Sequence, residues 1–165
     1  MALLGWVPWE GIKMESRPMF VRNESGIFES RTVAVKILQS PSIFLMGMEN
    51  SILGVWVAHS EGRCFWPDER ILNLAVNSGQ NLAPIRFVDD YGKETQEYPY
   101  NPNGSMMGIT AICSRNGRHL VMMPHPERPF LAWQWSYWPE GWSDIKVSPW
   151  LRLFQNARNW CEETA

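Results

Sequence analysis

The chain has 165 residues, of which 45% are hydrophobic and 19% charged, so it has the size and composition of one globular domain and not of a disordered or collagen-like chain. Its formal net charge is −2, which leaves no basic excess to neutralise a phosphate backbone, and we expect no nucleic-acid partner. The sequence has no run of about 18 apolar residues to cross a membrane, no signal peptide at its start and only three scattered cysteines, so we expect a cytoplasmic protein without a membrane contact.

The first part of the chain predicts a helix end and two strands. Residues 1–5 have the composition of a last helical turn, with Gly5 as its stop. Residues 28–38 alternate between apolar and polar side chains, which is typical of a half-buried strand. Residues 53–58 are continuously apolar, which suits a buried strand of a parallel sheet.

Two helices are predicted from capping residues and helical spacing. Asp68 is the candidate N-cap of a helix that ends before Gly79. Ser148 is the candidate N-cap of a last helix, with Pro149 at its first position. We expect this helix to pack on the sheet through the following apolar residues: Trp150, Leu153, Phe154, Ala157 and Cys161.

Three further strands are predicted at 85–88, 108–114 and 119–123, and the last two form a hairpin around Asn116-Gly117. Several buried strands with only two full helices predict an α/β or α+β fold whose front part is missing. We expect the chain to be the back part of a larger fold. One sheet should join the strands near Val33, Val55, Phe87, Ile112 and Val121.

Ten tryptophans are several times the ordinary usage for a chain of this length. A tryptophan buries a large area and needs a partner for its indole N–H. Two interpretations stay open, a tryptophan-rich core and a loop-rich surface that packs against something larger.

A proline-rich loop after the last strand carries His125 and Glu127. Pro124 and Pro126 stiffen the backbone around this imidazole. A carboxylate can hold one ring nitrogen protonated and leave the other as a base for a nucleophile. The spacing therefore indicates an acid–base pair, and a chance His and Glu in a surface loop is the alternative.

A second histidine lies at a strand end, where His59 precedes Glu61. The two could form another acid–base pair, or both His-x-Glu units could chelate zinc. Neither a His-Glu-x-x-His helix nor a cysteine pair accompanies them, so we expect no metal site. A structural role for His59 is the plainer interpretation.

The three cysteines, Cys64, Cys113 and Cys161, are interpreted as structural thiols. A nucleophile elbow needs a small-residue turn between a strand and a helix, and none of the three lies on such a turn. The sequence therefore contains a base and the carboxylate that orients it, without their nucleophile.

The histidine loop is similar to that of class I glutamine amidotransferases, and the segments around it match one family in order. They are Phe20–Asn23, Phe28–Arg31, Ser40–Phe44, Val57–Gly62, Asp89–Gly92, Tyr98–Ser105, Asn116–Arg118, Met123–Arg128, Ser148–Trp150 and Asn156–Arg158. Together they resemble the C-terminal glutaminase domain of the phosphoribosylformylglycinamidine synthase family. The stretches Leu4–Val7 and Trp133–Trp135 resemble its large, single-chain eukaryotic form.

This resemblance implies that ammonia is released from glutamine for the ATP-dependent conversion of formylglycinamide ribonucleotide to formylglycinamidine ribonucleotide, a step of de novo purine biosynthesis. In the family, the residues that match His125 and Glu127 are catalytic and activate a cysteine. His59 and Ser60 would line the glutamine pocket. The expected partners are glutamine, a synthetase domain and the upstream part of the glutaminase domain. ATP and magnesium would act in that synthetase domain, so we expect no cofactor in this chain.

The departures from the family concern the nucleophile and the pocket. The family's Cys-Asn-Gly-Cys-Gln elbow does not occur, and its usual place is just before Met1. The resemblance therefore implies that residues 1–165 are the C-terminal part of a glutaminase domain, inactive alone. The implied fold is an incomplete three-layer, flavodoxin-like α/β domain without its nucleophile elbow, whose parallel sheet has lost its first strands and exposes an apolar edge. Ser60 replaces a usual Gly and Met106 a usual Pro, and Ser60 could narrow the glutamine pocket. The alternatives are a non-catalytic interaction or regulatory module, and a standalone hydrolase that uses Cys64.

Overall fold

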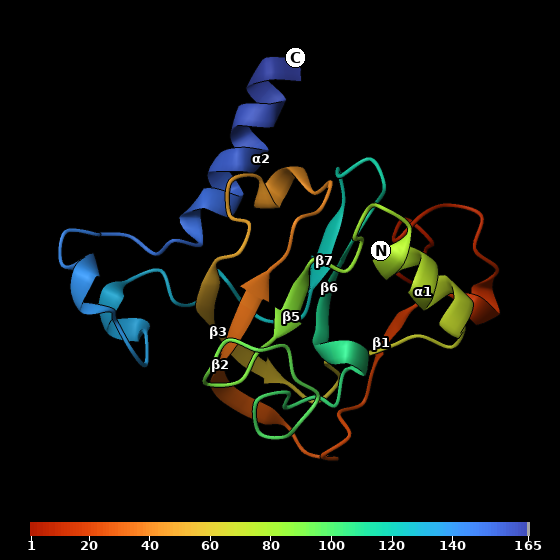
Figure 1. Ribbon diagram of the computed structural model, residues 1–165, viewed down its shortest axis with the longest axis horizontal. Helices are drawn as coiled ribbons and strands as arrows, with labels where there is room; N and C mark the ends of the chain where they lie inside the picture. The colour runs from red at the N-terminus through yellow and green to blue at the C-terminus, as the bar shows by residue number, and fades with distance from the viewer. Residues whose placement is uncertain (165) are drawn as a thin grey trace.

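The computed structural model describes residues 1–164 and contains a five-stranded sheet, in the order β3-β2-β5-β6-β7, beside a two-stranded ribbon of β1 and β4. The strands are β1 (Met19–Val21), β2 (Glu29–Ile37), β3 (Ile52–His59), β4 (Arg63–Phe65), β5 (Ile85–Phe87), β6 (Ile109–Cys113) and β7 (Leu120–Met122). The α-helices are α1 (Glu69–Asn77) and α2 (Leu151–Thr164), and short 3-10 turns include η2 (Ile43–Leu45) and η3 (Met106–Gly108). Figure 1 shows the sheet between α1 and the start of α2.

The five strands expected in one sheet are all found there, but the expectation of a parallel sheet is wrong. Among the described residues, all strand pairings of the five-stranded sheet are antiparallel. Parallel neighbouring strands need a crossover connection, which is usually a helix. In this sheet, no α-helix connects β2 to β3, β5 to β6 or β6 to β7. The hairpin prediction is confirmed, since β6 and β7 pair around Asn116 and Gly117. The ribbon of β1 and β4 was not predicted, because each strand is only three residues long.

Two apolar clusters hold the sheet, one associated with each helix. Val35, Val55 and Phe87 are fully buried and pack with Trp150 and Leu153 at the start of α2. The second cluster joins α1 to the sheet through Leu72, Ala75, Ile109 and Ile112. Each fully buried side chain of this size stabilises the fold by about 1.5–3 kcal/mol. The alternation predicted for 28–38 is confirmed in β2, where every second residue from Val33 to Ile37 is buried.

Both predicted N-caps are confirmed. The Asp68 side chain accepts a hydrogen bond from the backbone N–H of Arg70, 2.9 Å away. The Ser148 hydroxyl accepts one from the backbone N–H of Trp150 at 3.2 Å. These caps satisfy donors that the first turn of a helix leaves without partners.

The apolar face predicted for α2 is only partly correct. Trp150 and Leu153 are buried, but Phe154 is 48% exposed and Cys161 is exposed. The helix leaves the core after its first turns and projects away from the sheet, as Figure 1 shows, so Phe154 and Cys161 stay exposed. The buried Asn156 takes the place of an apolar contact, and its side-chain amide donates to the carbonyls of Phe44 and Met46 at 3.0 and 2.8 Å.

Residues 1–5 form a turn, so the expected helical conformation is wrong for them. The predicted stop is nevertheless present, since Gly5 has a φ of +76°. Its N–H donates to the carbonyl of Ala2 at 2.9 Å, and that of Trp6 donates to the carbonyl of Met1 at 3.1 Å. This pair of bonds is the one that ends helices at a glycine.

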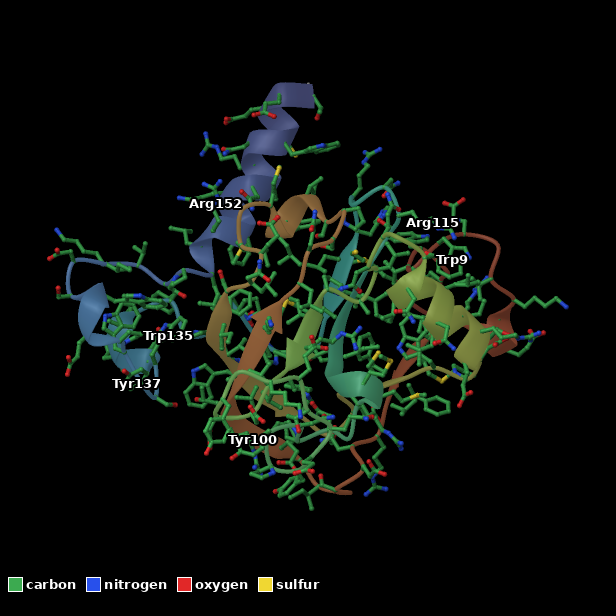
Figure 2. The ribbon with its side chains drawn as sticks, viewed as in Figure 1. Trp9, Tyr100, Arg115, Trp135, Tyr137 and Arg152 are labelled. Atoms are coloured by element: carbon green, nitrogen blue, oxygen red, sulfur yellow. The ribbon has the colours of Figure 1, made fainter. Side chains whose placement is uncertain are left out.

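The tryptophans serve both as core and as cover for an edge strand. Trp66 and Trp150 are among the largest fully buried side chains. The segment 129–147 folds over β3, where the Trp56 indole donates to the carbonyl of Gln134 at 3.2 Å. The Trp150 indole donates to the carbonyl of Gly54 at 2.8 Å. The Trp150 contact occupies a backbone carbonyl of β3 that an edge strand otherwise exposes. Trp135, labelled in Figure 2, lies against Gly54 of the same strand.

Candidate functional site

The backbone of His125 is held by the far edge of the sheet. The chain leaves β7 at Met122, and three residues later the N–H of His125 donates to the carbonyl of Trp56 in β3, 2.7 Å away. Since β7 and β3 are opposite edges, the sheet must curl to bring them this close. Buried Pro124 and Pro126 flank the histidine. The loop that carries it is therefore a short and braced connection.

The predicted contact between His125 and Glu127 is present. Nδ1 of His125 lies 2.8 Å from Oε1 of Glu127. The His125 side chain is 29% exposed and that of Glu127 56%, so both can be reached from solution. A carboxylate on Nδ1 favours the tautomer that leaves Nε2 free as a base.

His59 lies at the same end of the sheet as His125, as expected. It ends β3, is 8% exposed, and its ring centroid lies 6.4 Å from that of His125. Burial lowers the pKa of the His59 imidazole below its ordinary value of 6.5, and the side chain of Asn103 acts in the opposite direction. The ring lies directly on Gly62, where a Cβ would overlap Nε2 of His59.

The carboxylate nearest to His59 along the sheet is Glu29 and not Glu61. Glu29 pairs with His59 in the register of β2 and β3 and is 1% exposed, whereas Glu61 is exposed. Its Oε2 forms an ion pair with Nη2 of Arg31, 2.7 Å away, and neither carboxylate oxygen has a hydrogen-bond partner. Glu29 is not among the site residues that the sequence predicted. The signal was the alternation in β2, which places Glu29 on the same face as buried Val33.

The cysteines carry no accessible thiolate near this site. Cys64 and Cys113 are completely buried, and burial raises the pKa of each thiol to about 12. Cys64 lies in the ribbon strand β4 and not on a strand-to-helix turn. Cys161 is exposed, but it is on the projecting part of α2. The hypothesis of a hydrolase built on Cys64 is therefore disfavoured, because a thiol must ionise to act as a nucleophile.

Ser60 and Met106, the two departures from the family pattern, occupy different surroundings. The Ser60 side chain is exposed, and its carbonyl accepts a hydrogen bond from the N–H of Asn23 at 2.7 Å. The sulfur of Met106 lies 3.3 Å from the backbone nitrogen of Trp66. An effect of Ser60 on the glutamine pocket stays a prediction.

An open pocket of about 700 Å³ lies beside the histidine loop. Its lining combines Glu127 and Arg128 with aromatic side chains of the 129–147 segment, including Phe130, Trp133 and Trp135. Residues 1–164 contain no cluster of three or more His, Cys, Asp or Glu arranged to hold a metal ion. None of their helices is long and apolar enough to span a membrane.

Comparisons with known sequences support the resemblance over nearly the whole chain. The pattern described as the CobB/CobQ-like glutamine amidotransferase domain matches residues 1–161. The chain is 56% identical over 167 residues to the probable phosphoribosylformylglycinamidine synthase, chloroplastic/mitochondrial, of Arabidopsis thaliana, with 98% of this chain and 12% of that protein covered. It is 42% identical over 174 residues to the human phosphoribosylformylglycinamidine synthase, with 99% and 13% covered. The chain thus spans only about an eighth of these relatives.

A solved structure supports the fold. The structure of PurLQS from Thermotoga maritima superposes with a TM-score of 0.57 at 23% sequence identity, and the match covers 90% of this chain and 55% of that one. The expected fold class, a partial α/β amidotransferase domain, is thereby confirmed.

Proposed function

Because the chain belongs to the CobB/CobQ-like glutamine amidotransferase domain family, we propose that it is part of a glutaminase domain that releases ammonia from the side-chain amide of glutamine. The observation that carries this proposal is the hydrogen bond of 2.8 Å between His125 and Glu127. The ammonia serves the ATP-dependent conversion of formylglycinamide ribonucleotide to its amidine, in a longer protein of the phosphoribosylformylglycinamidine synthase type. ATP and magnesium act outside this chain.

In the proposed reaction, Glu127 accepts the Nδ1–H of His125 and holds the ring in place. Nε2 then takes the proton from a cysteine thiol, and the thiolate attacks the amide carbon of glutamine. The protonated imidazole returns a proton to the departing ammonia, and water hydrolyses the thioester that remains. General acid–base catalysis of this kind contributes about 10²–10⁴-fold. We propose that His59 and Ser60, which are not among the residues lining the pocket of about 700 Å³, border the part of the site that receives glutamine.

The nucleophile of this reaction is not one of the buried thiols of the chain. Burial raises the pKa of the Cys64 and Cys113 thiols to about 12, so both are protonated at neutral pH. The reaction therefore needs a cysteine from a strand-to-helix turn, which residues 1–165 do not supply. We propose that the 165-residue chain by itself hydrolyses no glutamine.

The proposal is tested by measuring ammonia release from L-glutamine in a longer protein that includes the Cys-Asn-Gly-Cys-Gln turn. His125→Ala should lower the rate by about 10²–10⁴-fold. His119→Ala is the matched control and should leave the rate unchanged. This third histidine belongs to the β6–β7 hairpin, and its ring lies next to that of Trp6. A His125→Ala protein with the parent rate would refute the proposed role.

The chain alone gives the complementary measurement. Purified 1–165 should release no ammonia above the buffer level, and Cys64→Ser should change nothing. Turnover that is present in 1–165 and lost in Cys64→Ser would instead establish the standalone hydrolase.

An interaction or regulatory module is the second candidate function, and the exposed aromatic residues favour it. Trp133 is 79% exposed, Tyr137 73% and Phe130 56%, on one segment beside the pocket. If this is the function of the chain, 1–165 should associate with a full-length synthase of a relative in sedimentation experiments, and Trp133→Ala should weaken the complex. If no association is detected, the interaction module is rejected and only the catalytic proposal remains.

We also propose a cytoplasmic location. The plant relative is named as chloroplastic/mitochondrial, so an organelle is the competing location. Fractionation of cells that express the complete natural protein, followed by immunoblotting, distinguishes the two.

A further inference from the structure

One buried side chain joins three of the sequence segments that carry the family resemblance. Asn23 comes from Phe20–Asn23, and its partners belong to Val57–Gly62 and Tyr98–Ser105. It is 3% exposed and lies in the connection between β1 and β2. The catalytic scheme above assigns it no part.

Asn23 uses both ends of its side-chain amide. Nδ2 donates to the carbonyl of His59 at 2.7 Å and to that of Ile27 at 3.0 Å. Oδ1 accepts from the N–H of Gly62 at 2.9 Å and from Nδ2 of Asn103 at 2.8 Å. Every donor and acceptor direction of a primary amide is thereby occupied.

The backbone of Asn23 adds to this arrangement. Its N–H donates to the carbonyl of Ser60 at 2.7 Å. His59, Ser60 and Gly62 are thus each bonded to the same asparagine, so the turn that follows β3 is held at three points.

This turn determines where the imidazole of His59 lies. The ring rests on Gly62, where no Cβ would fit, and the side chain of Asn103 lies against the same place. Moving Gly62 away from Asn23 would remove the surface on which the ring rests. The ring centroid of His125 is 6.4 Å from that of His59, so such a movement reaches the proposed catalytic pair.

We propose that Asn23 is a positioning residue of the site, which fixes the His59–Gly62 turn and thereby the placement of the His59 imidazole beside His125. The inference rests on the proposed function only for the reaction that this site performs. The positioning itself is a statement about geometry and can be tested without turnover.

The chain provides a matched control in Asn156. This asparagine is also 3% exposed and also donates its amide to two backbone carbonyls, those of Phe44 and Met46. It joins α2 to the η2 segment, and both of its side-chain hydrogen bonds go to that segment and not to the His59–Gly62 turn. Substitution of either asparagine removes similar bonds, but only Asn23 should affect the histidines.

The experiment uses NMR of the imidazole nitrogens, because the sequence contains only three histidines and His119 serves as an internal reference. Asn23→Ser should shift the ring signals of His59 and His125 and raise the titration midpoint of His59, since a loosened turn gives the ring back to water. The groups that act on His59 electrostatically, Glu29, His125 and Arg128, are unchanged in this variant.

Asn156→Ser should leave the signals of His59 and His125 where they are. Equal shifts in both variants, or none in Asn23→Ser, would overturn the proposal. If Asn23→Ser does not fold, Asn23→Gln, which keeps an amide but moves it one methylene away from Gly62 and Asn103, should produce the same shifts, and unchanged His59 signals would then overturn it.

Addition of L-glutamine to a longer protein that carries the cysteine turn separates this inference from the proposed function. Histidine shifts caused by Asn23→Ser, together with no glutaminase activity in the parent protein, would retain the positioning role and reject the function. Where activity is present, Asn23→Ser should raise KM or lower kcat, and Asn156→Ser should change neither.

Discussion

His59 and His125 have ring centroids 6.4 Å apart, yet each is paired with a carboxylate in a different way. His125 bonds to Glu127 two residues away, on a loop where the carboxylate is 56% exposed. His59 lies opposite Glu29 in the register of β2 and β3, and Glu29 is 1% exposed, with an ion pair to Arg31 but no hydrogen bond to either carboxylate oxygen.

This difference in exposure and hydrogen bonding indicates which of the two pairs can take part in proton transfer. An exposed pair with a direct hydrogen bond can exchange protons with a ligand, whereas burial of a charged group costs free energy that the contacts of the surrounding fold must offset. We therefore propose that His125 with Glu127 transfers protons, and that His59 with Glu29 shapes the site.

The largest effect expected from this comparison is on activity. In a longer protein with the cysteine turn, Glu127→Gln should lower ammonia release from glutamine by about 10²–10⁴-fold, because an amide no longer holds His125 in the required tautomer. Glu29→Gln, the matched change in the buried pair, should cost less than about tenfold. Initial rates of the two variants decide the assignment, and the reverse order of the two effects would contradict it.

A second prediction concerns the space beside the buried histidine. Gly62→Ala should lower the free energy of unfolding by about 1–3 kcal/mol, because its Cβ overlaps His59 and the packed ring must move. Gly141→Ala is the control, since a Cβ there would meet no atom within 4 Å. Urea unfolding monitored by tryptophan fluorescence measures both. Equal stability of the two variants would show that the ring adapts at no cost.

A third prediction has the opposite sign. Glu29→Met should raise the free energy of unfolding by about 1 kcal/mol, because it replaces a buried carboxylate that has an ion pair but no hydrogen bond, and Arg31 can turn to water. Glu127→Met should change stability by less than about 0.5 kcal/mol, as exposed pairs contribute little. Loss of stability in Glu29→Met would mean that the carboxylate is well satisfied.

The smallest effect is the dependence of stability on pH. Burial lowers the pKa of His59 in the folded chain below the 6.5 of an unperturbed histidine, so the unfolded chain binds more protons between the two values. The contribution of neutral His59 to stability is complete above 6.5 and decreases as the pH falls through 6.5 toward the folded value. Urea unfolding of the parent and of His59→Asn between about pH 7.5 and 5.5 should show a shallower decrease in the variant. Identical slopes would rule this contribution out.

The sequence predicts one of the two histidine pairs and only half of the other. His125 and Glu127 are neighbours along the chain, so their spacing is sufficient to bring them together. Glu29 and His59 are 30 residues apart and meet because β2 and β3 pair in one particular register. The alternation in β2 places Glu29 on the buried face, but the register that sets it opposite His59 depends on contacts between two strands and not on a local pattern.

Local patterns determined the strands of the five-stranded sheet, the caps at Asp68 and Ser148, and the β6–β7 hairpin, because alternation, helix starts and tight turns depend on residues close in sequence. Tertiary structure alone decided that the sheet is antiparallel and curled, so that the loop from β7 brings His125 to β3. It also decided that α2 leaves the core before Cys161 and that Asn23 joins three distant segments. These features arise from contacts between residues far apart in sequence, whose free energy depends on the whole packed fold.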